Sequence, residues 1–346
     1  SSAASDVYKR QVFTGTSIGS TKSVISEIVF NTSMTGYLEV LTDPSYAGQA
    51  VVMTYPLIGN YGITPDMESK QPWPDGYIVR ELSRIPSNFR CQGTIQDFLK
   101  EHDIPGIAGI DTRALTKILR EKGTMNGMIT TDENYKLDEI LPQLHVYNTG
   151  NVVDKVTCSE KEVLKADGYK VALLDFGAKN NIAQSLHKRG CEVTIYPAHT
   201  TAEEILASNP DGIMLSNGPG DPKACTDIIK EVKKLYDSEV PIFAICLGHQ
   251  LMALATGADT YKLKYGHRGG NHPVKDLETG RVYISSQNHG YAVDAESLDP
   301  AVAVPAFTNV NDGTNEGLKY TGKNIFTVQF HPEACPGPQD SGYLFD

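Results

Sequence analysis

The chain has 346 residues, 40% of them hydrophobic and 21% charged, which is typical of a globular protein long enough for two domains. Its formal net charge of −11 argues against a nucleic-acid-binding surface, and its longest apolar run, around residues 240–247, is too short to span a bilayer. No secretion signal is visible at the start, so we expect a cytoplasmic protein without a membrane partner. The cysteines contain no Cys-x-x-Cys pair and predict free thiols rather than a disulfide framework or zinc ribbon; they are Cys91, Cys158, Cys191, Cys225, Cys246 and Cys335.

The first half of the chain predicts a mixed α/β domain. Residues 1–11 have few apolar positions and no periodicity, so we interpret them as a disordered or non-native tail. Over residues 12–150, β-rich stretches alternate with Gly, Pro, Asn and Asp turns, and two helical patterns follow at 94–103 and 112–123. The polar segment that follows predicts a connection, which we place at residues 151–168.

The second half, residues 169–346, predicts a largely parallel sheet covered by helices. Short apolar, β-branched runs such as KVALLDF, DGIMLSN and VPIFAIC suit strands buried on both faces, and helical stretches such as NNIAQSLHKRG lie between them. This alternation is typical of βαβ units. Beyond Gly257 the strand-like segments lack crossover helices, so one edge of the sheet is expected to be mixed.

Polar motifs follow several of these strands at their carboxyl ends, where ligands bind in open α/β sheets. The motifs bring a thiol, imidazoles, a carboxylate, amides and a glycine turn to one rim of the sheet, which is the inventory of a cysteine acyl-transfer site. They are NGPGDP (217–222), CLGHQ (246–250), QNHGYAV (287–293) and HPE (331–333).

Cys246 lies between an apolar strand and a helix-like pattern. A cysteine at a helix N-terminus is favoured as thiolate, and the turn after it offers the Leu247 N–H to an oxyanion. The alternative is a buried structural thiol, the commoner role of a free cysteine. The other motifs at the rim favour the nucleophile.

His331 and Glu333 supply a base and its orienting carboxylate. In an extended segment, residues two apart point the same way, and Pro332 biases His331 away from helix. A satisfied surface histidine is the alternative. A metal site is less favoured, because no further ligand has metal-site spacing.

Other motifs carry weaker signals. The 217–222 turn could hold an oxyanion, although most such clusters are only turns. Residues 317–323 match most of a phosphate loop, but Asn324 replaces the required Ser or Thr and a strand follows, which predicts a hairpin. His267 and His272 are interpreted as part of a polar loop rather than a metal site. His249 is expected to face away from the thiol and not to act as the base.

Taken together, CLGHQ, NGPGDP and the late HPE resemble the class I (triad-type) glutamine amidotransferase family. In the first half, FNTSMTGYLEVLTDPSYAGQ (30–49), TYPLIGNYGI (54–63) and GIDTRALTKILREKGTMNG (109–127) resemble the small subunit of carbamoyl-phosphate synthetase. The blocks DFGAKNNI (175–182) and GHRGGNHPV (266–274) fit the same family, so the resemblance covers the chain from about Val12 onward.

The resemblance implies an activity and a partner. Small subunits of this family hydrolyse glutamine and pass ammonia to a large subunit, which uses bicarbonate and ATP to make carbamoyl phosphate for arginine and pyrimidine synthesis. It implies a heterodimer, alone or in a higher assembly, with ATP and Mg in the large subunit and no cofactor or metal in this chain. The implied catalytic residues are Cys246, His331 and Glu333, and the implied glutamine-binding residues are Ser45, Gly218, Gly220, Leu247, Gln250, Asn288, Gly290 and Tyr291.

Two other functions remain as alternatives: a non-catalytic docking subunit, and an amidotransferase that serves another synthetase. The chain departs from the family at Ala244, where Gly is common, and at both ends, which lack an initial strand and a final helix. We expect the small side chain of Ala244 to be tolerated.

Overall fold

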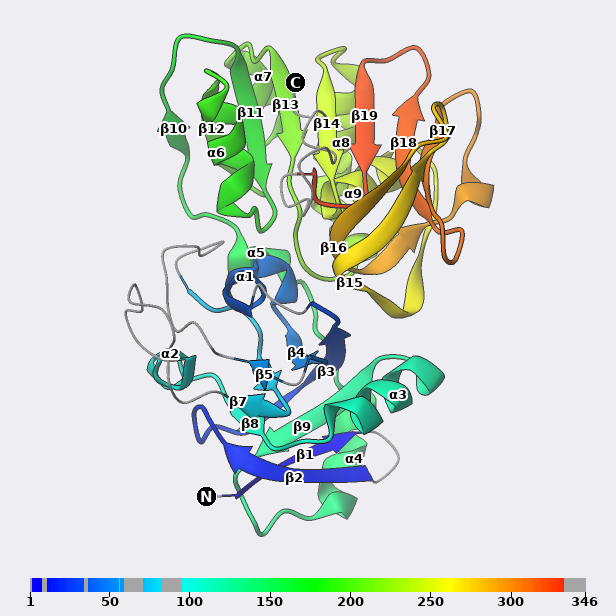
Figure 1. Ribbon diagram of the computed structural model, residues 1–346. Helices are drawn as coiled ribbons and strands as arrows, with labels where there is room; N and C mark the ends of the chain where they lie inside the picture. The colour runs from blue at the N-terminus through cyan, green and yellow to red at the C-terminus, as the bar shows by residue number, and fades with distance from the viewer. Residues whose placement is uncertain are drawn as a thin grey trace. The chain divides into compact units, whose positions relative to one another are not determined.

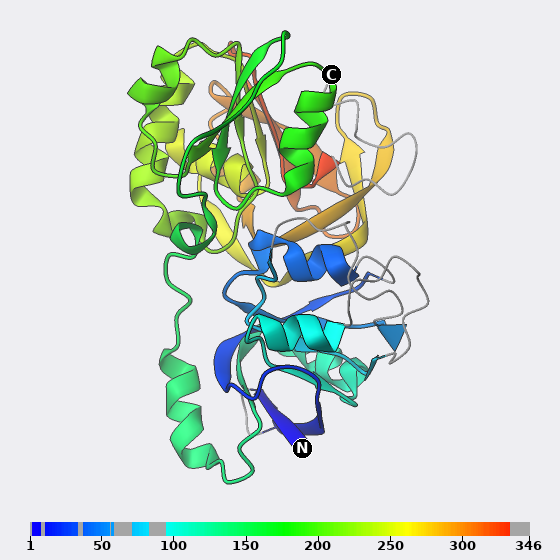
Figure 2. The same ribbon diagram turned by 90° about the vertical axis from the view of Figure 1, so that its left-hand side faces the viewer.

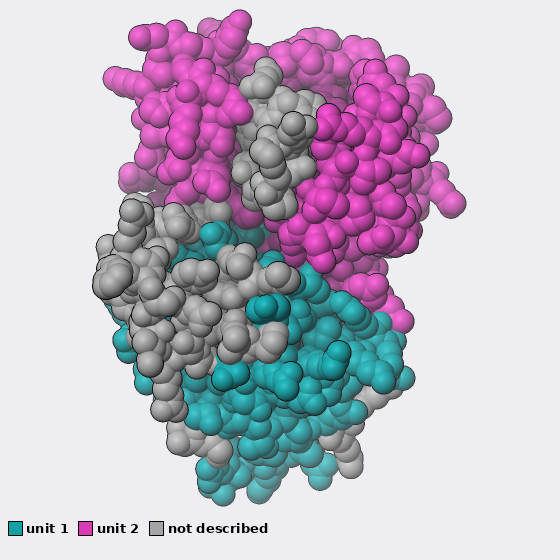
Figure 3. Space-filling model, in the orientation of Figure 1, with its two compact units in different colours: residues 1–150 teal, residues 151–346 magenta. Residues whose placement is uncertain are grey.

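The computed structural model describes residues 2–7, 11–33, 37–55, 57–58, 71–82 and 95–332. The chain divides into two compact units, residues 1–150 and 151–346, drawn in separate colours in Figure 3. Within the described ranges, no helix is long and apolar enough to cross a membrane.

Unit 1 is built on a closed barrel. Its strands follow the order β1 (Ser2–Val7), β2 (Gln11–Ser17), β8 (Gly106–Ala108), β6 (Gly76–Ile78), β4 (Gln49–Met53), β3 (Val24–Asn31) and β9 (Met125–Thr130), and β9 closes the barrel on β1. The neighbours β3, β4, β6 and β8 are parallel, and their largely buried residues are typical of parallel strands; the other pairs in the barrel are antiparallel. The unit also contains the short strands β5 (Leu57–Ile58) and β7 (Glu81–Leu82), a 3₁₀ turn at Pro44–Tyr46, and helix α4 (Leu137–Val146).

Alternating side chains give the unit 1 strands two buried faces. Phe30 and Val52 share one hydrophobic cluster with Leu115 and Leu119 of α3 (Thr112–Lys122). The intervening strand residues pack with α1 (Tyr37–Thr42) and α2 (Ile95–Glu101) in a second cluster. Both α2 and α3 lie where the sequence predicted helices, and α3 ends at Gly123.

The start of the chain differs from the sequence prediction. Residues 1–11 were expected to be a disordered tail, but Ser2–Val7 forms β1, paired antiparallel with both β2 and β9. The ladder hydrogen bonds on both sides hold a segment that has little apolar surface of its own, and sequence periodicity does not report such bonds.

Unit 2 contains a ten-stranded sheet. Its order is β10 (Glu162–Leu164), β12 (Glu192–Pro197), β11 (Lys170–Asp175), β13 (Gly212–Leu215), β14 (Ile242–Ile245), β19 (Ile325–Val328), β18 (Asn315–Tyr320), β17 (Ala303–Asn309), β15 (Thr260–Asp276) and β16 (Val282–Val293). The pairs from β12 to β19 are parallel, and the remaining pairs are antiparallel. The prediction of a largely parallel sheet that is mixed at one edge is therefore confirmed (Figure 1).

Helices cover both faces of the parallel part of this sheet. Helix α6 (Asn180–Lys188) packs on one face, and α7 (Ala202–Ala207), α8 (Thr226–Asp237) and α9 (Leu247–Ala255) pack on the other (Figure 2). Leu173 and Met214 point to the first face, whereas their neighbours Leu174 and Leu215 point to the second. Burial on both faces explains the nearly continuous apolar strands.

The sequence predicted a connecting segment at residues 151–168, but these residues contain secondary structure. They contain helix α5 (Val153–Val156) and strand β10, which pairs antiparallel with β12 at the edge of the unit 2 sheet. A strand of three residues gives too short a pattern to detect. The hairpin predicted at residues 317–323 is confirmed, since β18 and β19 pair antiparallel on either side of it.

Candidate active site

Cys246 stands on a sharp turn between β14 and α9. Its backbone has φ 50° and ψ −108°, a conformation that costs a non-glycine residue about 1–3 kcal/mol. The turn is held because the Cys246 N–H donates to the Val328 carbonyl on β19 at 2.8 Å and the Gln250 N–H donates to the Cys246 carbonyl at 3.1 Å. A strained strand-to-helix turn of this kind is a nucleophile elbow.

Close packing of α9 against β13 fixes this elbow. The Gly248 N–H donates to the Ser216 carbonyl at 3.1 Å, and a side chain at Gly248 would place its Cβ 2.6 Å from the Leu215 carbonyl oxygen. Only glycine fits there. Ala244, the departure noted in the sequence, is fully buried in β14 within the same cluster as Leu215 and Leu247.

The glycine turn at 217–222 packs beside the start of α9. A Cβ at Gly218 would lie 2.3 Å from the Phe176 carbonyl oxygen and 2.8 Å from Leu247 Cδ2, and Gly220 has a φ of +87°. The buried Asn217 amide donates to the Gly177 carbonyl at 3.0 Å and accepts from the Lys179 N–H at 3.2 Å. Gly218 and Leu247, the two residues expected to bind an oxyanion, are therefore neighbours.

His331 follows β19, the strand beside β14, and is fully buried. Its N–H donates to the Ser286 carbonyl at 2.9 Å, and this isolated bridge ties it to β16. The Cys246 thiol donates to the carbonyl of Asn288, two residues further along β16, at a distance of 3.6 Å. The carboxyl ends of β14 and β19 and the middle of β16 thus bring Cys246, Asn288 and His331 together. Glu333 lies outside the described residues.

The other residues expected to bind substrate are divided between the units. Gln250, which is 3% exposed, donates its amide to the Tyr291 carbonyl at 2.8 Å and to Gln329 Oε1 at 2.9 Å. These bonds tie the first turn of α9 to the 288–291 segment, which also contains Gly290. Ser45 lies in unit 1, buried in the 3₁₀ turn, where its N–H donates to Asp43 Oδ1 at 2.9 Å.

Comparison with known proteins finds a family match for each of the two units. Residues 172–346 match the family described as glutamine amidotransferase class-I, and residues 7–129 match the carbamoyl-phosphate synthase small chain, CPSase domain. The carbamoyl phosphate synthase small chain of Clostridium perfringens is 52% identical over 97% of this chain and 95% of its own length. The chain belongs to the carbamoyl-phosphate synthase small-chain family.

Further relatives agree with this assignment. The Listeria monocytogenes and Oceanobacillus iheyensis small chains are 52% and 50% identical, over 96% and 97% of this chain and 92% of each relative. A solved structure described as a glutamine amidotransferase from Thermotoga maritima is 19% identical over 48% of this chain and 77% of that chain, with a TM-score of 0.39. That likeness is too distant to add to the assignment.

His249, three residues after the cysteine in this small-chain sequence, contacts β19. Its Nδ1 lies 2.7 Å from Thr327 Oγ1 on β19, and the side chain is fully buried. Burial lowers the pKa of His249 to about 3, so the imidazole is neutral at physiological pH. It therefore packs α9 against the sheet.

This lowered pKa predicts acid destabilisation. Below about pH 6.5 His249 becomes protonated in the unfolded chain but stays neutral in the folded chain. The free energy of unfolding therefore falls as the pH drops toward the pKa of the folded state. At about pH 5 the loss from this group is about 2 kcal/mol. Denaturant unfolding at two pH values should show a shallower pH dependence in His249→Asn than in the wild type. Thr327→Val keeps the imidazole and should retain the pH dependence of the wild type. An equal pH dependence in all three proteins would refute the lowered pKa of His249.

A second group of titratable side chains lies behind the 288–291 segment. His267 and His272 were predicted to lie in a polar loop, which is wrong: both belong to β15, where His267 pairs with His289 on β16. Burial lowers the pKa of His267, but hydrogen bonds to Asp312 and Glu316 outweigh it and raise that pKa to about 9. Burial and the neighbouring His267 hold the pKa of His289 well below its usual value. Sequence analysis missed this cluster because it forms across strands.

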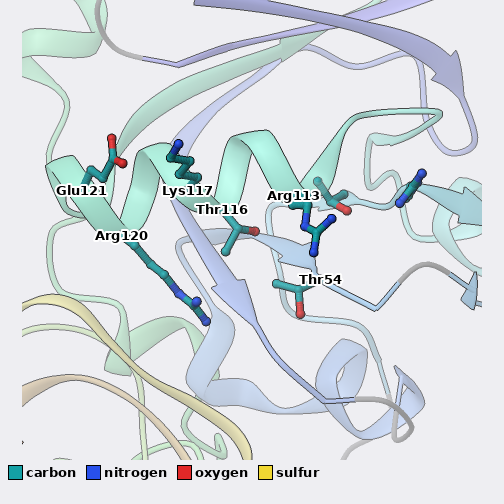
Figure 4. Close-up of a pocket in the computed structure, with 8 residues that line it drawn as sticks. Thr54, Arg113, Thr116, Lys117, Arg120 and Glu121 are labelled. Atoms are coloured by element: carbon teal, nitrogen blue, oxygen red, sulfur yellow. The ribbon is translucent and has the colours of Figure 1, made fainter.

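A separate pocket lies in unit 1 (Figure 4). It has a volume of about 680 Å³, and Arg113, Thr116 and Arg120 project from α3 toward the side where Thr54 lies. The remaining lining residues are Arg80, Thr112, Lys117 and Glu121. This basic lining favours anions. The described lining residues all belong to unit 1, whereas Cys246 belongs to unit 2.

Proposed function

We propose that this chain hydrolyses glutamine to glutamate and ammonia at Cys246 and supplies the ammonia to a large subunit. That subunit would make carbamoyl phosphate from bicarbonate and ATP, for arginine and pyrimidine synthesis in the cytoplasm. The observation that carries the proposal is the elbow: a cysteine held at φ 50° where a strand of the parallel sheet meets a helix. Membership of the small-chain family implies the large partner.

The first half-reaction is acylation of the thiolate. Cys246 Sγ attacks the side-chain amide carbon of glutamine, and the carbonyl oxygen takes the negative charge. The backbone N–H groups of Gly218 and Leu247 would receive it, and the close packing of the Leu247 side chain against Gly218 supports this pairing. Each such donor lowers the barrier by about 3 kcal/mol. The C–N bond then breaks, the nitrogen leaves as ammonia with a proton from His331, and a γ-glutamyl thioester remains.

The second half-reaction returns the thiolate. His331 removes a proton from water, and the resulting oxygen nucleophile attacks the thioester carbon. The C–S bond breaks, which releases glutamate and the Cys246 thiolate. Glu333 is proposed to orient His331 and to stabilise its cation. The bridge from His331 to Ser286 supports the role of His331 as the base, because it fixes the His331 backbone beside the strand that contacts the thiol.

The remaining predicted residues are proposed to bind glutamine. Gln250 ties the start of α9 to Tyr291, so the nucleophile and the 288–291 segment hold one geometry. Gly220 extends the turn that contains Gly218. Ser45 would contribute from unit 1. We propose no metal or cofactor for the glutaminase chemistry itself, and we place ATP and Mg²⁺ in the large subunit.

The proposal is tested by trapping the thioester. The chain, co-purified with its large ATP-binding subunit, is mixed with radiolabelled glutamine and quenched in acid. We expect glutamate release and label bound to the small chain, removable by hydroxylamine. A folded complex that binds its partner but neither releases glutamate nor retains label would instead favour the non-catalytic docking function.

A further inference from the structure

The buried cluster behind the 288–291 segment places metal-ligating atoms close together. The ligand atoms of His267, His289 and Glu316 all lie within 4.8 Å of one another. The three side chains are buried, with Glu316 fully inaccessible to solvent. Gln287, 2% exposed, directs Oε1 toward both rings, 3.2 Å from His267 Nδ1 and 2.8 Å from His289 Nε2.

The two imidazoles have too few protons for their contacts. His289 faces the Tyr291 carbonyl through Nδ1 at 2.7 Å and Gln287 Oε1 through Nε2. His267 faces Asp312 Oδ2 through Nε2 at 2.7 Å and Gln287 Oε1 through Nδ1. All these partners are acceptors, whereas a neutral imidazole has one N–H. Two neutral rings would leave two of the four contacts without a donor proton, and an imidazolium at His267 would still leave one.

A flipped Gln287 amide does not remove the deficit. The Ser285 hydroxyl donates to the His272 carbonyl at 2.7 Å, so Ser285 Oγ accepts from its other neighbour. That neighbour is Gln287 Nε2 at 2.9 Å, which leaves Oε1 facing the rings. The Glu316 carboxylate gives a further indication of a missing ligand, since its Oε2 is buried and has no hydrogen-bond partner among the described residues. Buried polar atoms are normally satisfied.

The outer contacts have the arrangement found around metal-bound histidines. Such a histidine donates its second ring N–H to a carboxylate or a backbone carbonyl, which fixes the ring and its tautomer. Here Asp312 takes that place for His267 and the Tyr291 carbonyl takes it for His289. Asn309 donates to Glu316 Oε1 at 3.2 Å and orients the carboxylate. The remaining nitrogens, His267 Nδ1 and His289 Nε2, both face inward.

We propose that His267 Nδ1, His289 Nε2, the Glu316 carboxylate and Gln287 Oε1 bind a divalent transition metal, with Zn²⁺ the best fit. Tetrahedral zinc with bonds of about 2.0–2.1 Å separates its ligands by about 3.3 Å. His267 Nδ1 lies 3.4 Å from Glu316 Oε1 and 3.2 Å from Gln287 Oε1. The 2.8 Å between Gln287 and His289 would lengthen by about half an ångström.

The site would join three strands behind the proposed glutamine-binding segment. His267 lies on β15, Gln287 and His289 on β16, and Glu316 on β18, and Asn288 is the residue whose carbonyl contacts the Cys246 thiol. A metal there is structural, since the protein supplies all four ligands and leaves no open position for chemistry. The site is independent of the glutaminase proposal.

The test measures Zn²⁺ content. The full chain with Cys246→Ala, which removes the reactive thiol, is equilibrated with micromolar ZnSO₄, gel-filtered and analysed by elemental mass spectrometry. We expect about one Zn²⁺ per chain. Added Glu316→Gln or His267→Gln should abolish binding, and Asp312→Asn should weaken it roughly 10- to 100-fold. His272→Asn is the matched control; its ring lies 5.3 Å from that of His267 but outside the ligand set, so Zn²⁺ should stay bound.

Cobalt substitution identifies the ligands. Co²⁺ at this site should give tetrahedral visible bands without thiolate charge-transfer absorption, and Zn²⁺ should raise the unfolding temperature of the parent but not of Glu316→Gln. If the folded parent binds no more Zn²⁺ than Glu316→Gln, the proposal fails, and His267 is an imidazolium paired with Asp312 and Glu316. Charge-transfer bands would show that cysteines hold the metal and would also overturn it.

Discussion

Cys246→Ala is expected to remove glutamine hydrolysis, with kcat lowered by at least about 10⁴-fold, while both units stay folded. The loss is large because the proposed acylation uses the Cys246 thiolate as its nucleophile. The backbone N–H donors at the turn can stabilise an oxyanion only after that atom has attacked. The fold should persist because alanine keeps the buried β-carbon and the elbow is held by backbone hydrogen bonds to Val328 and Gln250. Glutamate release by the purified complex is the measurement.

Two controls separate chemistry from damage. Cys191→Ala removes another free thiol, half-buried just before β12, and should retain wild-type turnover. The complex that contains Cys246→Ala should still make carbamoyl phosphate when ammonia is supplied, since the proposed function places the synthetase chemistry in the partner. Glutamine hydrolysis by Cys246→Ala at a substantial fraction of the wild-type rate would remove the cysteine from the mechanism.

The elbow could be predicted from sequence because its pattern is local. A strand, one cysteine and a helix follow one another within a few residues, and parallel strands bring their carboxyl ends to one edge. The placement of His331 beside β14 follows from the same rule, since β19 is the neighbouring strand. The family resemblance then narrowed the chemistry to glutamine.

The histidine cluster could not be predicted in the same way. His267 and His289 meet only because β15 and β16 pair in a register that is shifted twice by irregularities, and Glu316 arrives from β18, a different part of the chain. Sequence spacing reports neither the register of the two strands nor the burial of these side chains. Likewise β1 and β10 exist through pairing with other strands, so their own short sequences predict neither.

Gly248→Ala is expected to lower kcat/KM about 100-fold and to destabilise unit 2 by about 1–3 kcal/mol. An added Cβ would lie 2.6 Å from the Leu215 carbonyl oxygen, 2.7 Å from Leu215 Cβ and 2.8 Å from its carbonyl carbon. No flexible side-chain end can move aside, so β13 and the start of α9 must separate. That movement carries Cys246 and the Leu247 N–H with it, which is why the rate should suffer more than the fold.

Gly212→Ala is the matched control, because Gly212 lies in β13, the strand against which Gly248 packs. Its added Cβ would meet only the Pro241 carbonyl oxygen, at 3.9 Å, so neither stability nor turnover should fall. Denaturant unfolding and glutaminase kinetics on both variants distinguish the outcomes. A Gly248→Ala protein with wild-type kcat/KM would mean that the elbow tolerates displacement from β13. The position of the thiol relative to the 217–222 turn would then not limit the reaction. The proposal that Gly218 and Leu247 donate to the oxyanion would be contradicted.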